Sequence, residues 1–390
     1  MKFIHLSDLH LGARLDKMDL HEDQQHILQA IVDAVRDEKP EALVIAGDVY
    51  DKADPPADAI GLFNRFITAL SVAVPDMHIM VISGNHDSGD RLDLYRDILT
   101  RQNIHVAGTL PRSPEERIPK VTLKDAHGPV HFYLLPYVRP GAARRALGDP
   151  QGSLSYEDAV SGLIEQENVN PDERNVLVTH QFYVPVGKSA DDMTSQQTES
   201  ELPPMIGNVD AVSASVLEPF VYAACGHLHR PMNIGNNARY CGTPLQYSKS
   251  EADQGKSITV VELDEPRGEA HVSQIPLEPL RPVHKVWGTF EELTNDAAEE
   301  CTDLTYVTLV DEDLPEPHII ISELRKKYPN IVRYDVLRSD EWDMPDELPI
   351  PVVQQKSTLE VCLEFLQRDT TEEEEELLQE IIGGIEHETD

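Results

Sequence analysis

Residues 78–87 read HIMVISGNHD. The apolar run at 78–82 is typical of a buried strand, and the turn Gly84-Asn85-His86-Asp87 follows it after one serine. This turn gathers an amide oxygen, an imidazole and a carboxylate at the edge of a core, where unpaired polar groups cost free energy. A turn of this composition therefore indicates a functional role.

Four other segments share this pattern, in which an apolar strand is followed at once by carboxylate or imidazole side chains. In chain order these residues are Asp8 and His10, Asp48 and Asp51, His180, and His227 and His229. In an open α/β sheet, ligands bind outside the carboxyl ends of the strands, so residues far apart in the chain can meet there. The sequence thus predicts one site built from five strand ends.

The side chains in this set predict a particular kind of metal site. Carboxylate, imidazole and amide oxygen together suit manganese, iron or zinc better than magnesium or calcium, which prefer oxygen ligands alone. A carboxylate such as Asp48 could bridge two ions. Two ions about 3.5–4 Å apart can hold both the attacking and the leaving oxygen of a phosphoryl group. The predicted chemistry is the hydrolysis of phosphodiesters.

Each motif taken alone has an ordinary structural explanation. Asp8-x-His10 is a weak signal, Asp48 could cap the helix that follows, and a lone histidine such as His180 is more often a hydrogen-bonded core residue. The joint occurrence of the motifs, each at the end of a strand, favours the metal site.

Composition limits the class of protein. The chain has 390 residues, which predicts two or three domains. It carries 33 Lys and Arg against 70 Asp and Glu, a net charge of -37. Taken alone, this acidity argues against nucleic acid, which requires a basic face. Metal ions can supply positive charge where a phosphate is bound, so a nucleic-acid substrate stays open.

The cysteines and the N-terminus predict the compartment. Cys225, Cys241, Cys301 and Cys362 form neither a CxxC motif nor a zinc spacing, which is typical of free thiols in a reducing compartment. The N-terminal apolar run is too short for a signal peptide. No segment approaches the ~20 apolar residues of a membrane helix. We expect a cytoplasmic protein.

The order of expected elements changes along the chain. Up to about residue 110, strands and helices alternate; beyond about 118, strands predominate up to about 263. The expected strands are 3–6, 42–46, 78–82, 104–106, 120–123, 130–135, 175–179, 221–225, 239–241 and 257–263. The expected helices are 20–38, 57–70, 95–101 and 155–168, and a polar loop is expected at 187–208.

The C-terminal third divides into smaller parts. Three prolines within 276–282 mark a domain boundary. Beyond it, alternating strands and helices between 283 and 337 predict a small α+β domain, and a second proline-rich linker follows at 343–351. Residues 357–385 read as two amphipathic helices. These helices either pack within their own domain or dock on a partner protein.

The motifs Asp-x-His, Gly-Asp-x-x-Asp, Gly-Asn-His-Asp, a lone histidine and Gly-His-x-His, in this order, resemble the calcineurin-like metallophosphoesterase superfamily. Residues 4–12, residues 47–51 with Pro55-Pro56, and residues 240–244 are similar to one bacterial branch. Its members are nuclease subunits that work with an ATPase in DNA repair and recombination. The motifs cover residues 1–250, and the remainder is similar in layout only.

The resemblance implies the fold class and the domains. The fold would be α/β (α+β): a β-sandwich flanked by helices, with a small α+β capping domain and a C-terminal helical pair. The implied boundaries are 1–278 for the metallophosphoesterase (nuclease) domain, 279–340 for the capping domain, and 341–390 for a linker and a helix-loop-helix tail that binds a partner.

The resemblance also implies roles for single residues. Asp8, His10, Asp48 and His229 would hold one metal ion, and Asp48, Asn85, His180 and His227 would hold a second. The cofactor would be two Mn²⁺ ions per chain, with other divalent metals possible. His86 would lie beside the scissile phosphate as a transition-state stabiliser or general acid, oriented by Asp87. Archaeal and eukaryotic relatives tend to carry histidine in place of Asp51.

The activity implied by the resemblance is a 3′–5′ exonuclease on double-stranded DNA and an endonuclease on single-stranded or hairpin DNA. A homodimer would bind a coiled-coil ATPase of the structural-maintenance type through residues 357–385. Arg14, Lys17 and Arg91 could face DNA, although any single one is more commonly a solvated surface charge. The alternatives are another calcineurin-like phosphodiesterase or phosphatase, and a non-catalytic scaffold.

Overall fold

The structure of the protein is a computed structural model. It describes residues 1–149, 154–188, 193, 211–252, 254–264, 269–295, 300–311 and 313–337. The predicted linker at 343–351, the tail helices at 357–385 and most of the predicted loop at 187–208 lie outside the described residues.

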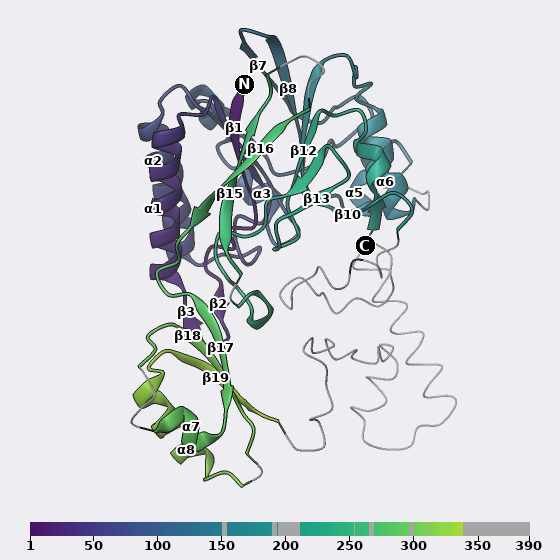
Figure 1. Ribbon diagram of the computed structural model, residues 1–390. Coiled ribbons are helices and arrows are strands. Elements are labelled where there is room, and N and C mark those ends of the chain that lie inside the picture. The colour runs from purple at the N-terminus through teal and green to yellow at the C-terminus, as the bar shows by residue number, and fades with distance from the viewer. Residues whose placement is uncertain are drawn as a thin grey trace, which may run out of the picture. The chain divides into compact units, whose positions relative to one another are not determined.

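Two six-stranded sheets form the larger part of the described chain (Figure 1). The first sheet has, in order, β16 (His271–Leu277), β15 (Lys256–Glu262), β1 (Lys2–Leu6), β4 (Ala42–Ala46), β5 (His78–Ile82) and β6 (Ile104–Ala107). The second has β13 (Met232–Ile234), β14 (Ala238–Tyr240), β12 (Tyr222–Cys225), β9 (Arg174–Thr179), β8 (Gly128–Leu135) and β7 (Lys120–Asp125). The central strands of each sheet run parallel.

The two sheets pack face to face, and helices cover their outer faces. Along β4 and β5, alternate residues take opposite sides: Val44 and Met80 join the core between the sheets, whereas Leu43 joins the core under the helices. The first sheet is covered by α1 (His21–Glu38) and α2 (Ala57–Ala73), and the second by α5 (Pro140–Ala146) and α6 (Tyr156–Glu165). Strands buried on both faces explain the continuous apolar runs in the sequence.

The predicted fold class is confirmed, because this arrangement is a β-sandwich flanked by helices. The helix predicted at 20–38 is α1, which packs Ile27, Ile31 and Val35 against the sheet. Strand β16 was not predicted. It is the edge strand, and most of its residues are exposed, so it lacks the alternating apolar pattern, and Pro276 is tolerated there because an edge strand has a free side.

A three-stranded parallel sheet follows, in the order β17 (Val283–Gly288), β18 (Leu304–Leu309) and β19 (Ile331–Val336). Helices α7 (Phe290–Thr294) and α8 (Pro317–Lys327) pack on one face of this sheet. Thr289 and Glu292 form a capping box that starts α7. The described part of α7 is shorter than the predicted helix, and residues 296–299 are not described. The elements are those predicted for the small α+β domain.

This small sheet packs against loops that belong to the sandwich. Leu15, Leu20 and Tyr247 share an apolar cluster with Val283 and Tyr306. Two ion pairs also join the small sheet and its preceding segment to the sandwich. Lys249 Nζ lies 2.7 Å from Asp335 Oδ2, and the Arg281 guanidinium donates to the buried carboxylate of Asp23. This small sheet therefore supports the loop that follows Asp8 and His10, and residues 209–339 belong to one compact unit with residues 1–203.

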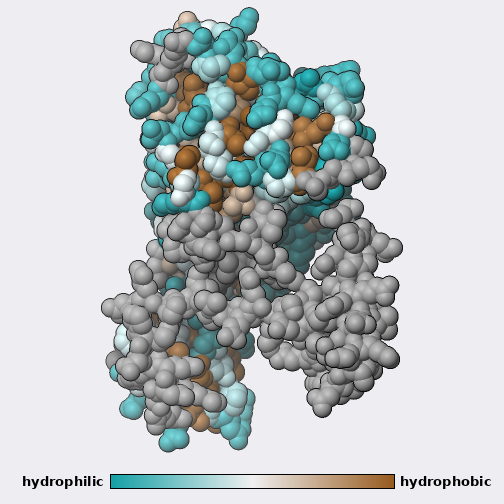
Figure 2. Space-filling model, turned by 90° about the vertical axis from the view of Figure 1, so that its right-hand side faces the viewer, coloured by the Kyte–Doolittle hydropathy of each residue, from teal (hydrophilic) through white to brown (hydrophobic). Residues whose placement is uncertain are grey.

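The described surface is mainly hydrophilic on the side of α5 and α6, where Figure 2 shows hydrophobic residues in smaller areas between hydrophilic ones. Among the described residues, no helix is long and apolar enough to cross a membrane.

Candidate metal centre

The predicted ligands meet where strands of both sheets end. They follow β1, β4 and β5 in the first sheet, and β9 and β12 in the second. Asp8, His10, Asp48, His180 and His229 are at most 4% exposed. Asn85 and His227 are partly exposed, so the site has one open side.

The first group of ligands comprises Asp8, His10 and His229, whose ligand atoms all lie within 4.8 Å of one another. The Nε2 atoms of His10 and His229 are 3.1 Å apart. His10 Nε2 lies 4.0 Å from Asp8 Oδ1 and 3.7 Å from Asp48 Oδ2. Two imidazole nitrogens that face each other beside a buried carboxylate fit one cation between them.

The second group surrounds the other side of Asp48. His180 Nε2 lies 3.3 Å from Asp48 Oδ2 and 3.0 Å from Asn85 Oδ1, and His227 Nδ1 lies 3.2 Å from the same amide oxygen. Because Asp48 Oδ2 approaches both His10 and His180, this carboxylate is placed between the two groups. The donor set of carboxylate, imidazole and amide oxygen fits divalent transition-metal ions.

Burial and nearby charges control the protonation of the imidazoles. It lowers the pKa of His227 to about 3, and the nearby charge of His180 acts in the same direction; burial also lowers the pKa of His10 well below its ordinary value. Both rings are then neutral at neutral pH, which is the form that binds metal. For His180, burial would lower the pKa, but the Asp48 carboxylate raises it to about 9. A metal ion held by His180 would displace this proton.

The backbone around the ligands is strained. Asp8, His10, Asp48 and His227 all have left-handed φ angles, of 53°, 42°, 48° and 103° respectively. Such conformations cost about 1–3 kcal/mol each in non-glycine residues and gather at functional sites. A Cβ atom at Gly84 would lie 2.1 Å from Asp48 Oδ1, so the glycine of the Gly-Asn-His-Asp motif is required by the close approach of this turn to the carboxylate.

A second layer of hydrogen bonds orients two of the histidines. His180 Nδ1 donates to the carbonyl of Ala46 at 2.7 Å, and His229 Nδ1 donates to Glu251 Oε1 at 3.3 Å. Glu251 is fully buried and pairs with the buried Lys256 at 2.6 Å. Burial alone would raise the pKa of Glu251, but the Lys256 ammonium holds it below its usual range. Such partners fix which ring nitrogen faces the metal.

Glu251 and Lys256 were not predicted from the sequence. They belong to no ligand motif, and Lys256 reads as the exposed start of a strand. The nearest sequence signal for this pair is the segment 240–244, which is similar to the nuclease branch. One of its residues, Thr243, donates through its hydroxyl to Glu251 Oε2 at 3.0 Å.

His86 lies on the open side of the ligand cluster. Its side chain is 35% exposed, and its Nε2 is 4.0 Å from Asp48 Oδ2. Its Nδ1 donates to the backbone carbonyl of Asp51 at 2.8 Å. The ring is thus held with Nε2 toward the ligands, as a group facing substrate requires.

The structure gives Asp87 a different role from the predicted one, which was to orient the His86 ring. Its carboxylate accepts from the backbone N–H groups of Val49, Tyr50 and Gly84, at 3.0, 2.9 and 2.9 Å. The atom that orients the His86 ring is therefore the carbonyl oxygen of Asp51, and Asp87 acts on the backbone by tying the turn at 84–87 to the loop at 48–51. Burial raises the pKa of Asp87 to about 6, and the nearby Asp48 acts in the same direction.

The predicted DNA-contact residues lie outside the ligand cluster. Arg14 begins the hairpin of β2 (Arg14–Leu15) and β3 (Met18–Asp19), and its guanidinium donates to the carbonyl of Lys17 at 2.8 Å. Arg91 pairs with Asp54 at 2.7 Å, and both are exposed. Contact of these three residues with DNA stays a prediction.

Comparison with known proteins bears directly on this site. A family model described as calcineurin-like phosphoesterase matches residues 1–231, more than half of the chain. The chain belongs to this family. The D subunit of the nuclease SbcCD from Staphylococcus epidermidis is 29% identical over 335 residues, which are 85% of this chain and 84% of that protein. The predicted similarity to a bacterial nuclease subunit is thereby confirmed.

Solved structures of diverse origin also match. GAP50 of Plasmodium has a TM-score of 0.39 at 12% identity, over 71% of this chain and 84% of that one. TT1561 of Thermus thermophilus has a TM-score of 0.39 at 11% identity, over 70% of this chain and 98% of that one.

Replacing Glu251 by glutamine tests the orienting layer. The Glu251→Gln variant loses the anion that holds His229 and leaves Lys256 buried without its counter-charge. We expect affinity for Mn²⁺, measured by titration calorimetry, to fall by about 10–100-fold. Glu262→Gln, at an exposed position of β15, removes the same charge and serves as the control. Equal Mn²⁺ affinity in the two variants would show that Glu251 does not support the site.

Proposed function

We propose that the chain is a metal-dependent DNA nuclease subunit, acting as a 3′–5′ exonuclease on duplex ends and an endonuclease on single-stranded or hairpin DNA. The observation that carries this proposal is the position of Asp48, whose Oδ2 lies 3.7 Å from His10 Nε2 and 3.3 Å from His180 Nε2. A carboxylate shared by two ligand groups is suited to two ions that act together on one phosphodiester.

The residues divide the work as follows. Asp8, His10, Asp48 and His229 would hold one Mn²⁺ ion, and Asp48, Asn85, His180 and His227 the other; when bound, the ions supply an activated water and neutralise charge on the phosphate. His86 Nε2 lies toward the ligands, 4.0 Å from Asp48 Oδ2. Because Nδ1 donates to the Asp51 carbonyl, Nε2 carries a proton only in the imidazolium form, and that form can donate the proton to the leaving oxygen. The Asp51 carbonyl fixes the tautomer of His86, because it accepts from Nδ1.

The relative from the SbcCD nuclease supports a place in a two-component complex. We propose that this chain forms a homodimer and binds an SbcC-like coiled-coil ATPase through residues 357–385. The complex would act in DNA repair, recombination and replication. Cys225, Cys241 and Cys301 are free thiols, which suits the proposed cytoplasmic location.

The His86→Ala variant tests the proposed chemistry. The ligand atoms of His86, His10 and Asp48 all lie within 4.8 Å of one another, but His86 belongs to neither proposed ligand set. We therefore expect the variant to bind two Mn²⁺ ions per chain and to lose about 10²–10⁴-fold in cleavage of duplex DNA ends because a general acid is missing. His127→Ala, at an exposed turn between β7 and β8, is the matched control. Metal content is measured by mass spectrometry and cleavage with labelled DNA.

Three results would contradict the proposal in different ways. Full cleavage by His86→Ala would remove the assigned role. Hydrolysis of nucleotides or phosphoproteins by the unmodified chain, without cleavage of DNA, would indicate another phosphodiesterase or phosphatase of the family. Absence of any Mn²⁺-stimulated phosphodiester hydrolysis would indicate a non-catalytic scaffold.

Deletion of residues 357–385 tests the proposed partner. We expect the full-length chain to co-purify with a large coiled-coil ATPase, in a complex whose mass gives two copies of this chain, and the deleted chain to purify without it. The deleted chain should keep the Mn²⁺ content of the full chain. Co-purification of the ATPase with the deleted chain would place its binding site elsewhere.

A further inference from the structure

A groove of about 720 Å³ opens beside the Gly84–Asp87 turn. Ser83 and Gly84 form one wall, residues 109–112 form a second, and Tyr137, Arg139 and Arg145 line a third. The groove therefore begins at the turn that carries Asn85 and His86. Its volume is that of a site for a small ligand, so it has room for a short length of one strand.

Three arginines line this groove in a chain whose net charge is -37. Arg139 NH2 is 3.5 Å from the carbonyl oxygen of Asn85, so this guanidinium reaches the backbone of a predicted metal ligand. Arg112 lies 3.8 Å from the exposed carboxylate of Asp90. No described residue forms an ion pair or side-chain hydrogen bond with Arg145. Asp87 also lines the groove, but its carboxylate is directed at three backbone N–H groups.

Tyr137 adds an aromatic wall close to the ligands. Its ring centroid lies 6.4 Å from that of His180, in an edge-on arrangement. Its backbone N–H donates to the carbonyl of Ser83 at 3.0 Å, which ties this wall to the turn. Cations that track a phosphate backbone, combined with an aromatic ring on which a base can stack, are the features by which proteins bind single strands.

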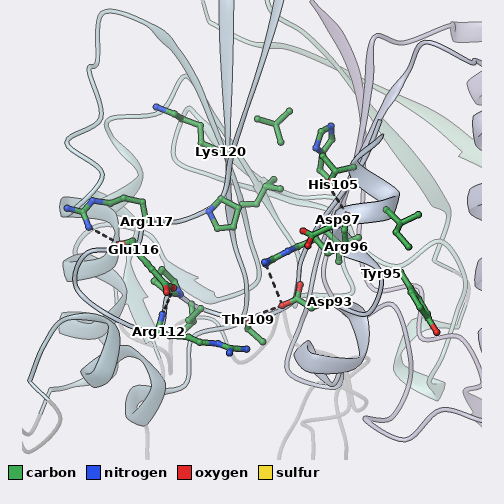
Figure 3. Close-up of a pocket in the computed structure, with 18 residues that line it drawn as sticks. Asp93, Tyr95, Arg96, Asp97, His105, Thr109, Arg112, Glu116, Arg117 and Lys120 are labelled. Atoms are coloured by element: carbon green, nitrogen blue, oxygen red, sulfur yellow. Dashed lines mark hydrogen bonds and ion pairs between the residues drawn. The ribbon is translucent and has the colours of Figure 1, made fainter. Parts of the chain in front are cut away.

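A larger cavity of about 950 Å³ lies on the other side of residues 109–112 (Figure 3), and its charges are arranged differently. Arg96 is 3.9 Å from Asp93, Arg117 donates to the carbonyls of Pro114 and Glu116, and Lys120 lies over the ring of Tyr133, 5.4 Å from its centroid. None of the predicted metal ligands lines it. Despite its size, this cavity lacks the position beside the predicted ligands that a substrate path requires.

We propose that the groove at 109–112 and 137–145 holds an unpaired segment of the DNA strand next to the phosphate being cut. Arg139 and Arg145 contact its phosphates, and Tyr137 contacts a base. This inference rests on the proposed function and deepens it, because it assigns the strand a path past the Gly84–Asp87 turn. It also shows how a chain with this net charge can bind DNA: the required positive charge is local.

Salt dependence of binding tests this path. Binding of a fluorescent single-stranded oligonucleotide to the full chain is measured by anisotropy over a range of salt concentrations. Each phosphate contact on a single strand contributes about 0.7 to the slope of log Kd against log salt concentration. We expect Arg145→Ala, and separately Arg139→Ala, to reduce the slope by about this amount, and Arg145→Lys to restore it. Lys120→Ala, in the larger cavity, removes the same charge and should keep the original slope.

A parallel assay separates this inference from the proposed function. The kcat/KM for the oligonucleotide is divided by that for a small phosphodiester, bis(p-nitrophenyl) phosphate, and we expect this ratio to fall in Arg145→Ala and not in Lys120→Ala. Equal slopes and ratios in the two variants overturn the strand path while leaving the nuclease intact. Binding with the expected slopes but without DNA cleavage overturns the nuclease and leaves the path. Binding of duplex DNA alone overturns the path.

Discussion

The site depends on three consecutive residues at the end of β4, Ala46, Gly47 and Asp48. Their carbonyl groups accept hydrogen bonds from His180 Nδ1, Asp8 N and His10 N, at 2.7, 3.0 and 3.0 Å. The Asp48 side chain accepts from the backbone of His86 at 2.9 Å. One strand end therefore fixes residues of the site that follow β1, β5 and β9. These contacts join residues from both sheets. The geometry of the ligands therefore depends directly on how the two sheets pack.

This constraint explains why the local backbone is strained and why glycine is needed. Asp48 itself has a left-handed φ of 48°, and the Gly84 turn approaches its carboxylate too closely for any side chain. Strained residues persist only where the surrounding structure holds them. Here the buried sheets hold the strand ends, and Asp87 ties the turn at 84–87 to the loop that follows Asp48. The site is thus held in place by the fold.

Much of this could be predicted from the sequence, because buried parallel strands are continuous apolar runs and the ligands follow them directly. Three features could not. Glu251 reaches His229 through tertiary packing alone, and no spacing reveals it. The orientation of His86 by the Asp51 carbonyl uses a backbone atom, which every residue has. The edge strand β16 is mostly exposed, so it carries little of the pattern that marks a buried strand.

The proposed two-metal site requires Asp48 to lie between the two ions. Anomalous X-ray diffraction from crystals of the full-length chain grown with Mn²⁺ would locate the ions themselves. We expect two anomalous peaks, one against Asp8, His10 and His229 and the other against Asn85, His180 and His227, with the Asp48 carboxylate in contact with both. A single peak, or two peaks that do not share Asp48, would contradict this arrangement.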